Sequence, residues 1–341
     1  MKKLSIKKIA IIAVIVLIVG GFFYSKWSAA NLVKKAAIPY STESKLVSFE
    51  IKIGETVGII GSNLKKENLI GDSSLFTAYA KKMEVDKKIK AGIYTLNTNM
   101  SVKGILQVLV SGERTEIWIT IPEGWRIDQI GDYLEKQSLT TSREFQDRAK
   151  VKNFVSIPFL SGLPGNTTLE GYLFPDTYRV FADTSVDQII QTMLDNFGKK
   201  VTKDMMDQAN KKGFTLHQFI TLTSIVEKES AHSEDIRKIA SVYYNRLEQG
   251  MPFQSDASIT YITRRADARP TIDETKIDSP YNTYLNKGLP PGPVGNPGLE
   301  AMMATLNPET TDYLFFVSKG NRAYFAKTYE EHLQNIEKYL D

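Results

Sequence analysis

The sequence contains no cysteine and only three histidines among its 341 residues. The absence of cysteine excludes disulfides, thiolate nucleophiles and cysteine metal ligands. His217, His232 and His332 show no metal-ligand spacing. There is also no glycine-rich phosphate loop, and no Ser-His or Ser-Lys arrangement stands out. We therefore expect neither a metal site nor a cofactor.

A strong charge of one sign is also lacking over most of the chain. The formal net charge is +4, from 43 basic and 39 acidic residues. The excess lies at the N-terminus, because residues 1–26 contain five lysines and no acidic residue. The remainder is close to neutral, whereas a nucleic-acid-binding domain needs a basic face. We expect no nucleic-acid partner.

One long apolar run is present, at residues 9–25, with four lysines before it and aromatic residues at its end. The run is just long enough to cross a bilayer, and the lysines predict a cytoplasmic N-terminus. We predict a membrane anchor at 9–27 after a cytoplasmic segment 1–8, then a tether at 28–45, with the rest extracytoplasmic. A cleaved signal peptide is the alternative, but the apolar run is longer than the apolar region of a typical signal peptide, and no clear Ala-x-Ala cleavage site follows.

The first folded unit is predicted from changes in apolar periodicity. Residues 47–53 alternate as a half-buried strand does. Two amphipathic helices are expected at 56–65 and 73–82, and a second strand at 91–96. Farther along the chain, helical segments predominate with a few strands between them. The fold class is therefore predicted to be α+β.

The helix expected at 215–230 is the most informative element. Thr215 and Gln218 form a capping-box pattern, and apolar residues at helical spacing predict a buried face. Its last turn carries Glu227 and Glu229, which lie about 200° apart around a helix and cannot act as a pair. A carboxyl at an apolar margin favours its neutral form, as a general acid requires. Geometry alone does not show which of the two glutamates is the acid. The alternative is that both are exposed to solvent in the last turn of the helix.

Several segments together resemble the endolytic murein transglycosylases, the YceG-like family. In chain order they are Leu169–Tyr178 (LEGYLFPDTY), Ser224–Ser230 (SIVEKES), Ala240–Leu247 (ASVYYNRL), Gln254–Asp256 (QSD), Ser279–Tyr284 (SPYNTY), Gly288–Gly292 (GLPPG), and Phe325 with Thr328, Glu331 and His332. In that family the catalytic glutamate directly precedes Ser or Thr. The resemblance therefore selects Glu229, with Glu227 as the alternative proton donor.

The resemblance implies a LysM-like subdomain at 46–112 and a YceG-like catalytic domain at 113–341. It implies cleavage of the bond between N-acetylmuramic acid and N-acetylglucosamine in nascent glycan strands, with a 1,6-anhydro product that ends strand growth. Peptidoglycan strands and membrane-bound synthases are the expected partners, besides the bilayer. The residues expected to hold the glycan are Gln254, Asp256, Tyr281, Asn282 and Tyr284.

Other readings stay open. A hydrolytic muramidase needs two carboxyls, and a non-catalytic wall-binding scaffold needs none. The LysM-like unit can bind carbohydrate or only orient the catalytic domain. For Glu170 and Asp176 we favour a role as loop-fixing hydrogen-bond acceptors over one as a second catalytic acid. Residues 288–298 can form a rigid wall beside the glycan or a plain connector, and the resemblance favours the wall.

Overall fold

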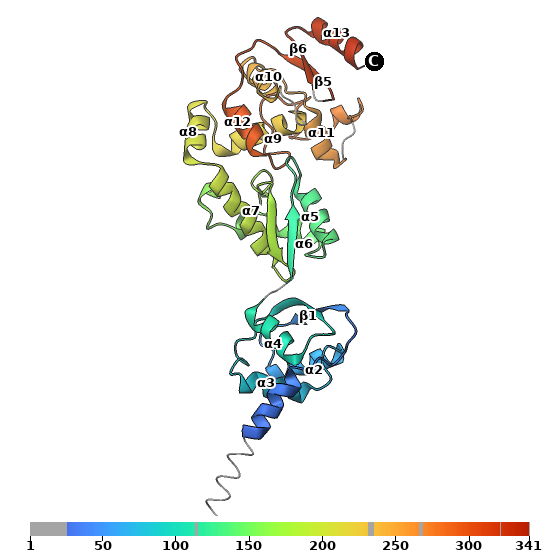
Figure 1. Ribbon diagram of the computed structural model, residues 1–341. Helices are drawn as coiled ribbons and strands as arrows, with labels where there is room; N and C mark the ends of the chain where they lie inside the picture. Colours follow the sequence, from blue (N-terminus) through green and yellow to red (C-terminus); the bar gives the residue numbers. More distant parts are fainter. Residues whose placement is uncertain (1–25, 113–114, 231–234, 266–268, 321, 341) are drawn as a thin grey trace, which may run out of the picture. The chain divides into compact units, whose positions relative to one another are not determined.

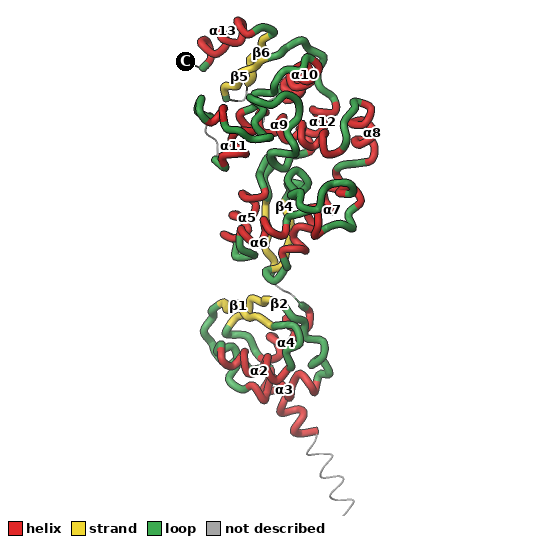
Figure 2. The backbone as a smooth tube through the Cα atoms, turned by 180° about the vertical axis from the view of Figure 1, so that it is seen from behind, coloured by secondary structure: helices red, strands yellow, loops and turns green. Residues whose placement is uncertain are grey.

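The structure is a computed structural model that describes residues 26–112, 115–230, 235–265, 269–320 and 322–340 (Figures 1 and 2). The apolar run at 9–25 lies outside these residues, and so does nearly all of the predicted anchor. Within the described ranges, no helix is both long and apolar enough to cross a membrane. The chain forms two compact units, one reaching to Ile117 and including Phe181–Asp183, the other made of Trp118–Val180 and Thr184–Asp341.

The first unit has the predicted order of strand, two helices and strand. Strand β1 (Leu46–Ile51) pairs antiparallel with β2 (Gly92–Asn97). Helices α2 (Val57–Lys66) and α3 (Ser73–Lys82) lie between them in the chain, and α4 (Val102–Ser111) follows. The N-cap side chains are the acceptors: Thr56 accepts the Ile59 N–H, Asp72 the Ser74 N–H and Ser101 the Gly104 N–H. These caps explain where the helices begin.

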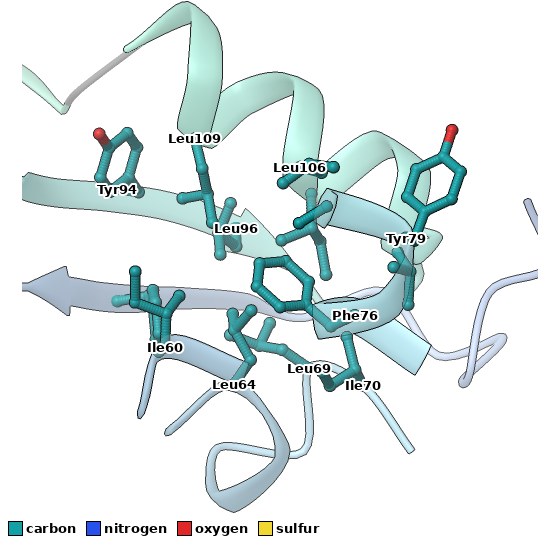
Figure 3. Close-up of a cluster of buried hydrophobic side chains, with 14 of the residues drawn as sticks. Ile60, Leu64, Leu69, Ile70, Phe76, Tyr79, Tyr94, Leu96, Leu106 and Leu109 are labelled. Carbon is teal, nitrogen blue, oxygen red and sulfur yellow. The ribbon is translucent and has the colours of Figure 1, made fainter. Parts of the chain in front are cut away.

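One hydrophobic core joins these elements (Figure 3). Phe76 of α3 is fully buried in the cluster with Leu64 of α2, Leu96 of β2 and Leu106 of α4. Residues 26–36 are helical, and they fall largely within the segment expected to be a tether. Ala36 is fully buried in the same cluster and Leu32 packs against it. Leu32 and Ala36 share one helix face at a spacing of four, so part of the expected tether is a packed helix.

The second unit contains most of strands β3 (Glu116–Thr120) and β4 (Thr177–Phe181), which pair. Helices α5 (Ile127–Lys136) and α6 (Ser142–Arg148) lie on one side of this pair and α7 (Val186–Lys200) on the other, in both views (Figures 1 and 2). Two short 3-10 turns, Val151–Asn153 and Pro158–Leu160, precede β4. Strand β4 starts at Thr177, within the segment Leu169–Tyr178 that carries the family resemblance, and its Tyr178 and Val180 alternate inward.

The rest of the second unit surrounds helix α9 (Leu216–Ser230). Helices α8 (Lys203–Lys211), α10 (Ile236–Glu248), α11 (Asp256–Thr263) and α12 (Leu299–Leu306) contact it. Antiparallel β5 (Phe315–Lys319) and β6 (Arg322–Ala326) follow, and α13 (Tyr329–Tyr339) packs on them. A 3-10 turn spans Glu274–Lys276. Helix α11 and strand β6 were not predicted from the sequence, because both are short and begin beside loop residues.

Candidate active site

Helix α9 is the buried support of the site. The predicted capping box is present, because Thr215 Oγ1 accepts the Gln218 N–H and Gln218 Oε1 accepts the Thr215 N–H. The side chains of Phe219, Leu222 and Ile225 are fully buried. Burial of that face fixes the rotation of the helix, and the rotation decides where its two terminal carboxylates point.

Glu227 faces the proline-rich segment 288–298, which runs beside α9 and is neither helix nor strand. Along this segment the Pro291 carbonyl lies 2.9 Å from His217 Nε2, the Val294 N–H donates to Ser224 Oγ at 3.0 Å, and the Gly298 N–H donates to Glu227 Oε2 at 2.9 Å. Glu227 thus holds the start of α12 against the end of α9.

Glu229 faces a different neighbour, the N-terminus of α11. Ser255 Oγ donates a 2.6 Å hydrogen bond to Glu229 Oε1, and the Ala257 N–H provides a further hydrogen bond. Ser255 is the N-cap residue of α11 and is 1% exposed. The carboxyl of Glu229 is therefore fixed in position while remaining half-buried at the margin of a cavity.

The electrostatic environment keeps Glu229 protonated to a higher pH than an ordinary glutamate. Burial is the main cause of its raised pKa, and the negative charge of Asp256 adds to it. The hydrogen bonds from Ser255 and Ala257 and the positive charge of Arg246 lower the pKa again. Because these effects partly cancel, the site can hold either form of the carboxyl.

The cavity beside Glu229 has a volume of about 480 Å³. It lies entirely within the second unit, and four regions of the chain line it. These are α9 and α10, the start of α11 with the loop before it, the loop after α11, and the C-terminal β5 and α13. The lining residues are Glu229, Tyr243, Arg246, Phe253, Gln254, Asp256, Arg269, Tyr284, Phe315, Phe316, Val317, Ser318, Tyr329, His332 and Leu340.

Arg246 supplies a buried positive charge to this cavity, and the sequence analysis did not single it out. Its guanidinium donates to the carbonyl oxygens of Leu314, Pro252 and Phe253 at 2.6, 3.1 and 2.8 Å. The side chain is 7% exposed, and burial lowers its pKa. No local signal in the sequence shows that three carbonyls will converge on it.

Three of the five predicted glycan-binding residues line the cavity with Glu229. They are Gln254, Asp256 and Tyr284. The Tyr284 hydroxyl donates to Asp256 Oδ1 at 2.5 Å. Gln254 has an exposed side chain and a left-handed backbone, with φ at 50°, and its Oε1 lies 3.4 Å from Arg246 Nη1.

The other two predicted residues, Tyr281 and Asn282, do not line this cavity. Asn282 is fully buried; its amide donates to the carbonyls of Thr275 and Ile277, and its Oδ1 accepts the Tyr284 N–H. Tyr281 packs on Tyr261 with ring centroids 4.9 Å apart. Both therefore shape the loop that carries Tyr284, and neither offers a free polar atom at the cavity.

Glu170 and Asp176 lie elsewhere and act on loops, as the sequence reading favoured. Glu170 is 4% exposed and accepts the Ile127 N–H at the start of α5 and an amide N–H of Asn296. Asp176 accepts the Thr177 N–H and an amide N–H of Asn196. Residues 288–298, which were expected to form a wall beside the glycan, instead lie along α9 and do not line this cavity.

The arrangement suits acid–base chemistry centred on a single carboxyl. A protonated Glu229 can donate to a leaving oxygen in the cavity, and the Ser255 and Ala257 donors then stabilise the carboxylate that remains. The neighbouring Asp256 contributes a second negative charge that can stabilise positive charge on a bound ring. These are the requirements for breaking a glycosidic bond by protonation.

Comparisons with known proteins agree on one family. A family model described as the YceG-like family matches residues 49–338. An endolytic murein transglycosylase of Bacillus subtilis is 34% identical over 340 residues, covering 95% of this chain and 91% of that protein. One of Streptococcus pneumoniae serotype 2 is 33% identical over 355 residues, covering 94% of this chain and 63% of that protein.

A crystal structure of a yceG-like protein from Listeria monocytogenes superposes on this fold with a TM-score of 0.59. The two chains are 33% identical, and the match covers 86% of this chain and 99% of that one. The likeness in sequence and the likeness in fold thus extend over both units.

Proposed function

The chain belongs to the YceG-like family, and from this premise we propose that it is a peptidoglycan lytic transglycosylase with Glu229 as its acid and base. The relatives' names support the reaction class. The observation that carries the choice of residue is the half-buried Glu229 carboxyl, bonded to Ser255 at 2.6 Å and facing the cavity.

In the first step, protonated Glu229 donates its proton to the oxygen that links N-acetylmuramic acid to N-acetylglucosamine. The bond from the muramic C1 to that oxygen breaks, and positive charge develops on the muramic ring. Asp256 lies in the same cavity and is held by Tyr284, so its carboxylate is available to stabilise that charge.

In the second step, the Glu229 carboxylate takes the proton of the muramic C6 hydroxyl, and O6 bonds to C1. A 1,6-anhydro ring forms without water, and Glu229 returns to its protonated state. The Ser255 and Ala257 hydrogen bonds favour the carboxylate between the two steps. One residue with two accessible protonation states is therefore sufficient.

Substrate binding is proposed for Gln254, Asp256 and Tyr284, because these predicted residues line the cavity with Glu229. Tyr281 and Asn282 are proposed to position the loop that carries Tyr284, given that the Asn282 amide is fully engaged and buried. Endolytic cleavage within nascent strands, and with it the termination of strand growth, is proposed from the relatives' names and the family resemblance.

We further propose that the first unit is LysM-like and that residues 9–27 anchor the protein in the cell membrane with both units outside the cytoplasm. The βααβ order of the first unit supports the former. The lysines before an uncharged run support the latter. Such an anchor keeps the cavity near newly made strands and near membrane-bound synthases, which are the proposed protein partners.

Hydrolysis is the second candidate, because Asp256 places another carboxylate in the same cavity. Product analysis separates the two reactions. Purified peptidoglycan is incubated with the full chain in ¹⁸O-labelled water, and the products are analysed by mass spectrometry. Anhydro-muramyl ends without ¹⁸O support the transglycosylase, whereas reducing ends that carry ¹⁸O would make the protein a muramidase. Products of mixed length, formed early, support endolytic cleavage.

A further inference from the structure

The cavity beside Glu229 has a wall that the reaction steps above do not use. It is supplied by the C-terminal hairpin and helix, through Phe315 of β5 and Tyr329 and His332 of α13. We call these three residues the C-terminal wall. They lie far along the chain from Glu229 and come from two elements, β5 and α13, yet all of them line one cavity.

The three rings of the C-terminal wall contact one another. The Phe315 ring lies 5.2 Å from the His332 ring at an interplanar angle of 28°, and 5.9 Å from the Tyr329 ring at 58°. Tyr329 is nevertheless 60% exposed. Aromatic side chains with a few polar atoms among them are typical of ligand-binding cavities, and an exposed tyrosine offers an apolar face together with a polar tip.

His332 provides a hydrogen-bond donor to this wall. Burial and the positive charge of Arg246 lower the pKa of His332, so its ring is neutral at pH 7 and carries one N–H. The Nδ1 atom is buried and has no hydrogen-bond partner among the described residues. Within the described part of the chain Nδ1 is therefore unpaired in either tautomer, and the tautomer with its proton on Nε2 is the one that offers an N–H to a ligand in the cavity.

We propose that the C-terminal wall is a sugar-binding subsite for one N-acetylated ring of the glycan. The ring lies against Tyr329 and Phe315, and the Nε2–H of His332 donates to a hydroxyl or acetamido oxygen. This inference rests on the proposed function, because it requires the glycan to occupy the cavity.

The test uses the full chain in detergent, with Glu229→Gln present so that the glycan is not cleaved. The probe is peptide-free glycan strands prepared with an amidase, and binding is measured by isothermal titration calorimetry. His332→Phe keeps the ring and its packing on Phe315 but removes the donor, so binding is expected to weaken about three- to tenfold, the effect of one hydrogen bond. The unfolding midpoint should stay equal or rise, because the buried Nδ1 is removed as well.

Two further variants separate binding from packing. His332→Gln restores an N–H donor near the position of Nε2 and is expected to bind within about twofold of the parent. Gln334→Ala changes an exposed residue on the same helix and should leave binding unchanged. Equal binding of His332→Phe and the parent would overturn the subsite, and so would a loss of binding that follows a loss of stability.

The subsite and the reaction can fail independently of each other. Anhydro-muramyl products from the parent chain, together with unchanged binding in His332→Phe, would refute the subsite and leave the reaction intact. Binding that depends on His332, without anhydro-muramyl products from the parent chain, would refute the reaction and leave the subsite intact.

Discussion

The two residues next to each other at the start of α11 should move the pH dependence of the enzyme in opposite directions. Ser255 donates to Glu229 and lowers its pKa, whereas the charge of Asp256 raises it. Activity requires protonated Glu229 and is lost as pH rises through its pKa. Ser255→Ala should therefore move the alkaline limb of kcat/KM to higher pH, and Asp256→Asn should move it to lower pH.

The sizes of the two shifts follow from the contacts. A hydrogen bond to a charged group contributes about 1.5–3 kcal/mol, and one pH unit of limb displacement corresponds to about 1.4 kcal/mol. The Ser255 bond is short and buried, so its removal is resolvable in an ordinary pH profile. Asp256 is partly exposed, and solvent screening should make its effect smaller. Asparagine retains the Oδ1 acceptor for Tyr284.

The assay follows the release of soluble fragments from labelled peptidoglycan at a series of pH values. Lower peak activity in either variant does not affect the test, because the readout is the position of the limb. Shifts in the same direction would refute the assignment of Glu229 as the titrating acid. Unshifted limbs in both variants, with activity reduced, would refute it equally.

Three further predictions concern side chains around the site. Burial raises the pKa of Glu170 from 4.5 to about 8. Between these pH values the folded state holds a proton that the unfolded chain has lost, so the free energy of unfolding should fall as pH rises. Glu170→Gln should make the free energy of unfolding, measured with urea, less dependent on pH, and an unchanged pH dependence would contradict a protonated Glu170. Asn282→Ala should cost about 1–3 kcal/mol of stability in the same assay, and because it loosens the loop that carries Tyr284 it should raise KM more than it lowers kcat. A variant that keeps its stability but loses its activity would return Asn282 to the binding surface. Glu227→Gln still accepts the Gly298 N–H and should keep most of the transglycosylase activity, so its inactivation would point to Glu227 as the acid.

Local patterns were sufficient to predict most of the helices, because their caps and apolar periodicity are encoded within a few residues. Thr215 with Gln218 is an example: the capping box was predicted and is present. The strand and helix order of the first unit followed in the same way. Elements β4, α11 and β6 were not predicted, because each is only five to eight residues long and follows residues that favour loops.

The site itself was only partly predictable. Sequence spacing placed Glu227 and Glu229 on opposite sides of a helix but did not say which side meets a cavity. That depends on the Gly298 N–H and on Ser255, which lie 71 and 26 residues away in the chain. Asn282 was likewise expected to bind the glycan, because the sequence does not show its contacts. In the structure its amide donates to two carbonyls within its own loop. Arg246 and His332 act through contacts that no local pattern records.

The measurement that tests the central claim most directly is the count of anhydro-muramyl ends released from purified peptidoglycan by the full chain, its Glu229→Gln variant and its Glu227→Gln variant. All three proteins are first shown to have equal unfolding midpoints. We expect anhydro-muramyl ends from the parent and from Glu227→Gln, and none above background from Glu229→Gln. Anhydro-muramyl ends from Glu229→Gln at the rate of the parent would contradict it.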